Sequence, residues 1–173
     1  MEKKCWYVAY THSRSEKKVQ NYFEDILKLE SYLPLVNVKR QWSDRVKWVE
    51  LPLFTSYVFV KTTADNLHEL ANVFGVARFL SFEGRFAAVR DEEIDLIKKI
   101  LKDGEEVSVE PRRFIRGQKV IVTEGAFEGL EGTLMTEHNT KRFIVKIAGI
   151  AQNISVSIPA KSLRVLNSTR ATA

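Results

Sequence analysis

Lys119-Val-Ile-Val-Thr-Glu-Gly-Ala-Phe-Glu-Gly-Leu-Glu-Gly-Thr-Leu134 is the stretch that decides the fold of the second half of the chain. Two runs rich in Val, Ile and Leu flank a turn that carries glycines at positions 125, 129 and 132. β-Branched residues favour a pleated strand, and glycine allows the backbone to reverse tightly. The segment lacks the Gly-Lys-Ser/Thr ending of a phosphate-binding loop. It therefore predicts two paired strands of a small β-domain.

Five short β-rich segments follow one another in this half, at residues 119–122, 131–135, 142–147, 154–158 and 163–166. Such a set is sufficient for a small closed or nearly closed barrel. β-Branched residues crowd 142–158, and Gly149 and Pro159 would interrupt a long helix. We therefore predict a C-terminal, five-stranded, SH3-like β-barrel over residues 114–167 that is constitutively β, followed by a frayed tail at 168–173.

The first half of the chain alternates between strand and helix patterns. Strands are expected at residues 6–10, 31–38, 56–61, 77–82 and 86–89. Ser13 and Glu16 have the spacing of a capping box, and apolar residues then recur at helical spacing, at Val19, Tyr22, Phe23, Ile26 and Leu27. Asp65 and Asp91 would each cap a further helix, the second with apolar positions at Ile94, Ile97, Ile100 and Leu101. We predict an α+β domain over residues 1–101, with an antiparallel sheet flanked by helices.

Residues 102–113 separate the two halves. They lack apolar periodicity, and they contain Gly104, Pro111 and several charged residues. Such a composition is typical of a solvated linker. We expect the two domains to move independently on either side of it.

Residues 39–50 predict a polar hairpin that turns at Ser43 and Asp44. Trp42 lies between Arg40 and Arg45 near the tip. An aromatic ring can stack on a nucleic-acid base while basic side chains hold the phosphates. The alternative is an ordinary solvated charged face.

The composition excludes several classes of function. The 173 residues carry 27 basic and 22 acidic groups, a net charge of +5, so tight, sequence-independent nucleic-acid binding by the free chain is not expected. One cysteine and three histidines, none in a metal-ligand spacing, indicate no metal site, no cofactor and no enzymatic activity. No apolar stretch approaches the ~20 residues of a membrane span. We expect a cytoplasmic monomer.

The stretch from Arg116 to Leu134 resembles the KOW motif of transcription elongation factors and some ribosomal proteins. The first hundred residues resemble the N-terminal domain of the NusG family, through Trp6-Tyr7, the segment Pro52-Leu-Phe-Thr-Ser-Tyr-Val-Phe-Val60, the step Gly75-Val-Ala-Arg-Phe79 and the closing helix. Together the two resemblances cover residues 5–166. Within the family the chain is most similar to specialised paralogues such as RfaH, and its basic hairpin resembles the UpxY-type antiterminators of capsular polysaccharide operons.

The resemblance implies binding rather than bond chemistry. Members of the family dock an apolar pocket on the clamp helices of bacterial RNA polymerase and suppress pausing. The positions that match this pocket are Tyr10, Phe54, Tyr57, Phe59, Ile97 and Leu101. These residues could instead simply fill the core. Thr55-Ser56 stands where NusG has Pro-Gly, and the threonine-rich patch of RfaH is absent, with His68-Glu69 only a weak substitute.

Specialised members also contact the exposed non-template DNA strand or nascent RNA. Candidate nucleic-acid contacts here are His12, Arg14, Lys18, Lys39, Arg40, Trp42, Arg45 and Lys47. The C-terminal barrel of the family binds Rho or a ribosomal protein through a phenylalanine, but Ala148 occupies that position here. This difference argues against a Rho or ribosomal partner. A KOW-containing RNA-binding or ribosome-associated module, and a housekeeping NusG, stay as alternatives.

Overall fold

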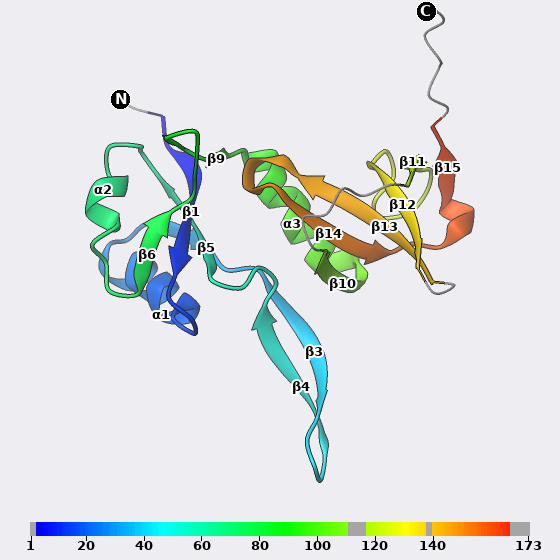
Figure 1. The fold of residues 1–173 in the computed structure, drawn as a ribbon, viewed down its shortest axis with the longest axis horizontal. Helices are drawn as coiled ribbons and strands as arrows, with labels where there is room; N and C mark the ends of the chain where they lie inside the picture. The colour runs from blue at the N-terminus through cyan, green and yellow to red at the C-terminus, as the bar shows by residue number, and fades with distance from the viewer. Residues whose placement is uncertain (1–2, 111–116, 138–139, 167–173) are drawn as a thin grey trace, which may run out of the picture. The chain divides into compact units, whose positions relative to one another are not determined.

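The computed structural model describes residues 3–110, 117–137 and 140–166 (Figure 1). These residues form two compact units, Met1–Leu101 and Lys102–Ala173. The fold class is α+β, as the sequence predicted: the first unit combines a sheet with helices, and the second is built of strands.

The central sheet of the first unit is antiparallel and has the strand order β2-β5-β1-β6. Its strands are β2 (Glu30–Tyr32), β5 (Tyr57–Thr62), β1 (Cys5–Thr11) and β6 (Val76–Phe79), and β9 (Ala88–Val89) also pairs with β1. Successive side chains of a strand point to opposite faces. Tyr7 and Ala9 therefore point to one face, and Val8 and Tyr10 to the other.

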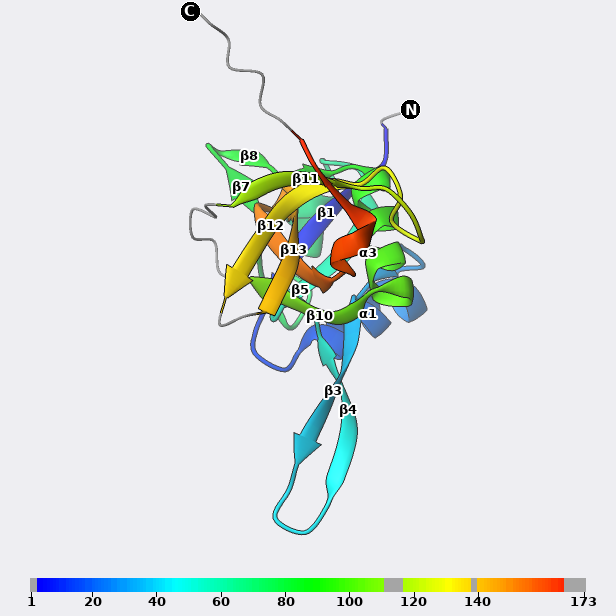
Figure 2. The ribbon, with the colours of Figure 1, turned by 90° about the vertical axis from the view of Figure 1, so that its right-hand side faces the viewer.

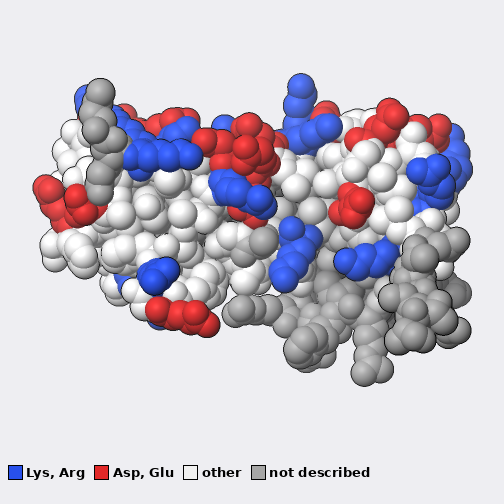
Figure 3. Space-filling model, turned by 90° about the horizontal axis from the view of Figure 1, so that it is seen from above, with Lys and Arg blue, Asp and Glu red and all other residues white. Residues whose placement is uncertain are grey.

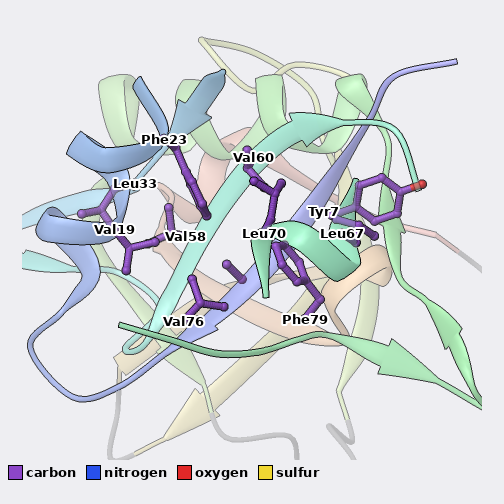
Figure 4. Close-up of a cluster of buried hydrophobic side chains, with 11 residues drawn as sticks. Tyr7, Val19, Phe23, Leu33, Val58, Val60, Leu67, Leu70, Val76 and Phe79 are labelled. Atoms are coloured by element: carbon purple, nitrogen blue, oxygen red, sulfur yellow. The ribbon is translucent and has the colours of Figure 1, made fainter. Parts of the chain in front are cut away.

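Helices cover both faces of this sheet. On the first face, Tyr7 and Ala9 join a buried cluster with Val19 of α1 (Glu16–Asn21), Phe23 of the π-helical turn η1 (Tyr22–Ile26), and Leu67 and Leu70 of α2 (Leu67–Leu70) (Figure 4). On the second face lies α3 (Asp91–Asp103), which buries Ile94, Ile97 and Ile100. The sheet is thus the middle layer of the unit.

All three predicted helix starts differ from the prediction. Asp91 does not cap α3 but is its first residue, and its carboxylate accepts hydrogen bonds from Trp6 and Lys61. Ser13 and Glu16 form no capping box, because α1 begins after Ser15, which makes no side-chain cap, and the Glu16 carboxylate accepts a hydrogen bond from the backbone N–H of Ser56 instead. Asn66 rather than Asp65 precedes α2, also without a side-chain cap. Tertiary contacts outweigh the local cap at Glu16.

The predicted first helix is only partly regular. Its second half is the π-helical turn η1, which has more residues per turn than an α-helix. The wider turn leaves Phe23 fully buried but exposes Tyr22 and Ile26, which the helical spacing had placed on the same apolar face.

Several expected strands are divided. The strand predicted at 31–38 is interrupted at Pro34, which has no N–H to donate to a ladder, and its two parts, β2 and β3 (Leu35–Gln41), belong to different sheets. The strands predicted at 77–82 and 86–89 become β6 and β9 together with a small hairpin of β7 (Ser81–Phe82) and β8 (Arg85–Phe86).

The predicted polar hairpin is present. β3 pairs with β4 (Val46–Pro52) in a two-stranded antiparallel sheet, and the backbone N–H of Trp42 donates to the carbonyl of Arg45 across the turn. In Figures 1 and 2 the hairpin projects away from the rest of the first unit.

The second unit is an antiparallel sheet with the strand order β10-β14-β13-β12-β11-β15. Five of its strands are those predicted: β11 (Gln118–Val122), β12 (Glu131–Glu137), β13 (Thr140–Ile147), β14 (Gln152–Ser157) and β15 (Leu163–Val165). Their buried side chains include Val120, Val122, Phe143, Val145, Ile147, Ile154 and Val156.

The prediction of an irregular linker at 102–113 is wrong for its described part. α3 continues to Asp103, and β10 (Glu105–Glu110) pairs with β14 as a sixth strand. Val107 and Val109 alternate with polar residues, and Val109 pairs with Ile154, so this alternation and the backbone ladder outweigh the high charge. Residues 111–113 of the linker, 114–116 of the predicted barrel and the tail at 168–173 lie outside the described residues.

The glycines of the deciding stretch serve two purposes. Gly125 and Gly129 have positive φ angles of 87° and 82°, which side chains rarely tolerate. Gly132 instead permits close packing, because a Cβ there would lie 2.5 Å from Cζ of Phe143. The tight reversal between β11 and β12 therefore depends on two glycines and the core beneath β12 on the third.

Candidate functional site

Four aromatic residues that the sequence singled out come together on the second face of the central sheet. Tyr10 and Tyr57 face each other across the β1–β5 ladder, with ring centroids 5.8 Å apart. The Phe54 ring lies 6.2 Å from Tyr57 and 6.2 Å from Phe59. Pairs at such distances stabilise each other beyond the area that they bury.

The cluster continues along the sheet to Tyr32 of β2, whose ring lies 6.2 Å from Phe59. Tyr32 was not among the predicted site residues, and its pairing with Phe59 through the β2–β5 ladder could not be known from sequence. We define the aromatic face as Tyr10, Tyr32, Phe54, Tyr57 and Phe59.

The aromatic face combines buried and accessible rings. Phe54 and Phe59 are buried, whereas Tyr10, Tyr32 and Tyr57 are half-buried. Burial also raises the pKa of Tyr32 to about 12. The two phenylalanines thus support the tyrosines from below.

Two cations border the aromatic face. The guanidinium carbon of Arg78 lies 5.2 Å from the centre of the Tyr10 ring, and Nζ of Lys98 lies 5.4 Å from that of Tyr32. A cation over an aromatic ring is attracted to its negative face. The face is therefore apolar at its centre and basic at two edges.

The two predicted pocket residues of α3 differ in exposure. Ile97 is buried together with Ile94 and Ile100, while Leu101 is half-buried one turn further along the helix. Ile97 therefore contributes to the packing of α3 in the core, whereas part of the Leu101 side chain is accessible to a partner.

The turn that presents Phe54 and Tyr57 is held by a buried carboxylate. Ser56 adopts a left-handed conformation with φ of 64°. Its backbone N–H donates to Oε1 of Glu16 over 2.9 Å, and its carbonyl accepts from the N–H of Thr11 over 2.8 Å. Glu16 was missed as a positioning residue because its spacing from Ser13 resembled a capping box.

Asp91 connects the start of α3 to the central sheet. Its Oδ1 accepts hydrogen bonds from Nε1 of Trp6 and from Nζ of Lys61, each over 2.8 Å. The bonds from Lys61 and then Trp6 lower the pKa of Asp91, and the bond to Asp91 raises the pKa of Lys61. α3 is thereby anchored at the end of the sheet away from Tyr10.

The register of the hairpin divides its predicted nucleic-acid contacts between two faces. Arg40 pairs with Lys47, and Lys39 pairs with Trp48. Because side chains alternate along a strand, Arg40 and Lys47 share one face, and Lys39 shares the other with Trp48. Trp42 and Arg45 follow the strand ends and continue the first face, because the N–H of Trp42 donates to the carbonyl of Arg45 as the next pair of the hairpin. All of these side chains are exposed.

Trp48 is a second exposed indole that the sequence reading missed. Its side chain is 70% exposed and that of Trp42 is 59% exposed. The alternation of Val46-Lys-Trp-Val49 in a polar hairpin could have revealed it, since Trp48 falls on the face opposite Val49.

The three predicted contacts near the first helix are exposed but separate from the hairpin contacts in the chain. His12 and Arg14 lie in the loop before α1, and Lys18 lies in α1. The backbone N–H of His12 donates to the carbonyl of Gly75, beside Phe74, whose side chain is 92% exposed. α1 reaches the base of the hairpin through Lys17, whose Nζ lies 3.5 Å from Oε2 of Glu50 in β4.

Charge is mixed on the molecular surface. On the face shown in Figure 3, basic and acidic side chains are interspersed. Among the described residues, no helix is long and apolar enough to cross a membrane, and no group of three His, Cys, Asp or Glu side chains could hold a metal ion.

Comparison with known proteins gives a consistent result. Residues 4–98 match the family described as "Transcription termination factor nusG". The chain is 29% identical over 172 residues to the "Transcription termination/antitermination protein NusG" of Rickettsia felis, covering 89% of this chain and 87% of that protein. The protein of the same name from Streptococcus pyogenes serotype M1 is 28% identical, with 80% of this chain and 83% of the other covered.

A solved structure supports the fold. "Domain interaction in Thermotoga maritima NusG" superposes with a TM-score of 0.57 at 23% identity, covering 95% of this chain and 98% of the other. The family match spans most of the first unit, and the relatives extend across both units. The chain therefore belongs to the NusG family.

Proposed function

We propose that this chain is a transcription elongation and antitermination factor whose first unit binds RNA polymerase through the aromatic face. The observation that supports this most is the gathering of Tyr10, Phe54, Tyr57 and Phe59 from β1, β5 and the turn before β5. Rigid aromatic side chains are frequent anchors of protein interfaces. The names of the relatives, transcription termination/antitermination proteins, agree with such a role.

The partner surface on polymerase would be apolar and α-helical, as the resemblance to the family's clamp-helix pocket implies. The half-buried edges of Tyr10, Tyr57 and Leu101 make the contact. Phe54 packs against Tyr57 and Phe59, and Phe59 and Ile97 are themselves buried. Arg78 at the border favours an acidic side chain next to the apolar contact.

The hairpin supplies the second part of the function. Arg40, Arg45 and Lys47 surround Trp42 on one face, a combination suited to stacking on a base and holding phosphates. We propose that this face contacts the non-template DNA strand or nascent RNA in the elongation complex. Because the net charge is only +5, this contact becomes effective once polymerase binding raises the local concentration of nucleic acid.

The hairpin also supports a specialised role rather than that of a housekeeping factor. It resembles the hairpin of UpxY-type antiterminators, and we propose that the chain acts on specific operons, such as those for capsular polysaccharides. In cells, its occupancy on the genome should be confined to a few operons. Broad occupancy would instead identify a housekeeping factor.

Single-round transcription on a paused bacterial RNA polymerase tests the main proposal. The wild-type chain should shorten the pause or increase read-through, and Phe54→Ala/Tyr57→Ala should abolish this effect. Phe74→Ala is the control, because it removes an aromatic ring that is 92% exposed and lies outside the aromatic face. The circular dichroism spectrum of each variant shows whether it is folded.

A chain that neither binds nor affects polymerase, with cognate polymerase and leader DNA present, would contradict the proposal. Binding of structured RNA in the absence of polymerase would then favour the KOW-containing RNA-binding module.

A further inference from the structure

The β3–β4 hairpin exposes both of its faces. Its two strands form a sheet of their own, and Figures 1 and 2 show it projecting from the first unit. A single indole is exposed on each face: Trp42 on one, Trp48 on the other. An exposed indole with basic side chains beside it offers a surface on which a nucleic-acid base can stack.

The two faces differ in charge. The face of Trp42 carries Arg40, Arg45 and Lys47. The face of Trp48 carries Lys39 directly across the ladder, with Gln41 and Val46 as the next pair. Glu50, also on this second face, lies near the base of the hairpin, where its Oε2 is 3.5 Å from Nζ of Lys17.

The second face fits a nucleic acid better than a protein. Its indole has a lysine as cross-strand neighbour and an amide side chain one pair further on. Lysine is depleted from the centres of protein interfaces, whereas an aromatic ring beside a cation is the usual composition of a single-strand binding surface. Gln41 adds a donor and an acceptor for a base edge.

We propose that the hairpin binds two separated nucleic-acid strands at once, one on each face, with Trp42 and Trp48 as stacking platforms. This inference extends the proposed contact of the Trp42 face. Trp42 and Trp48 lie on opposite faces of one two-stranded ribbon, whereas consecutive bases of a stacked strand follow one another along one side, about 3.4 Å apart. Consecutive bases of one strand therefore cannot reach both indoles, and the hairpin suits the junction where a duplex opens.

Intrinsic fluorescence of the full chain provides the test, because it has only three tryptophans and Trp6 is buried. Trp48→Phe leaves Trp42 as the exposed reporter, and Trp42→Phe leaves Trp48. Each protein is titrated at low salt with a forked DNA duplex that has two single-stranded arms, and with one arm alone. The fork should quench both reporters, whereas the single arm should quench Trp42 much more than Trp48.

The salt dependence of fork binding separates the two faces further. Trp48→Ala should weaken binding to the fork about fivefold or more. It should leave the slope of log K against log salt concentration unchanged. Arg40→Ala should reduce the magnitude of that slope by about one, because one phosphate contact and its released counterion are lost. Phe74→Ala, the control, should change neither quantity.

Equal quenching of both reporters by the single arm would overturn the proposal, since one strand would then cover both faces. Absence of quenching of Trp48 by the fork would also overturn it. Neither result bears on polymerase binding, which the pause assay with Phe54→Ala/Tyr57→Ala tests independently.

Discussion

The aromatic face and the hairpin present aromatic side chains in opposite ways. In the aromatic face, two buried phenylalanines and a sheet covered on both sides fix the tyrosines in place. In the hairpin, cross-strand pairing alone positions Trp42 and Trp48, with neither face covered by a core. A packed surface suits a partner of fixed shape such as a helical protein, and an exposed ribbon suits a flexible strand.

This comparison predicts a large difference in stability. Phe59→Ala should destabilise the first unit by about 3–5 kcal/mol, because it removes a fully buried ring. Trp48→Ala should change stability by no more than ~0.5 kcal/mol, since its ring is already in water. Chemical unfolding followed by the fluorescence of Trp6, in a Trp42→Phe/Trp48→Phe background for Phe59→Ala, measures the first effect, and circular dichroism measures the second. Similar losses in the free energy of unfolding for Phe59→Ala and Trp48→Ala would contradict the distinction between a packed aromatic face and an exposed hairpin.

The turn before β5 should depend on Glu16. Glu16→Ala leaves the buried N–H of Ser56 without its acceptor and should cost about 1–3 kcal/mol. It should also weaken polymerase binding, because Phe54 and Tyr57 flank Ser56. Glu50→Ala is the matched control: its ion pair with Lys17 is more than half exposed, so its loss should cost at most ~0.5 kcal/mol. If Glu16→Ala left the free energy of unfolding unchanged, the turn would be stable without this hydrogen bond.

Glycine should be more stable than serine at position 56. Its φ of 64° disfavours any side chain, and glycine relieves this strain. Ser56→Gly should stabilise the first unit by about 0.5–1 kcal/mol, measured by urea unfolding, and leave polymerase binding intact. A loss of stability would mean that the serine side chain makes a contact that outweighs the strain.

The smallest effect at neutral pH concerns Tyr32. Burial raises its pKa in the folded chain to about 12, from an ordinary value of 10.0. The folded state therefore holds its proton more tightly than the unfolded state, so this contribution to stability is complete below pH 10 and lost as the pH rises toward 12. Absorbance titration of phenolate should show a late-titrating tyrosine that is missing in Tyr32→Phe. Titration of all tyrosines near the ordinary value would contradict the burial.

The sequence predicted the elements with strong local signals. The alternation around Trp6 and Val58, the glycine-rich turn between β11 and β12, and the hairpin tip at Ser43-Asp44 all led to the right structure. The four central aromatic residues were also identified, by resemblance to the family, and the structure brings them together.

Other features depend on contacts that a sequence does not display. Glu16 leaves its expected cap because a distant N–H needs an acceptor, and η1 changes which residues of the first helix are buried. β10 looked like a linker because its pairing partner, β14, lies far along the chain. Lys39 was grouped with Arg40, although the register places them on opposite faces.

The central claim is that the aromatic face binds polymerase and the hairpin binds nucleic acid. Its most direct test is the affinity of core RNA polymerase for three proteins: the wild type, Tyr10→Ala/Tyr57→Ala and Arg40→Ala/Arg45→Ala. Removing the two half-buried tyrosines should abolish binding, whereas removing the two arginines should leave binding to core polymerase unchanged and affect only complexes that contain an exposed DNA strand. Equal loss of polymerase binding in both variants, or normal binding by the tyrosine variant, would contradict the account.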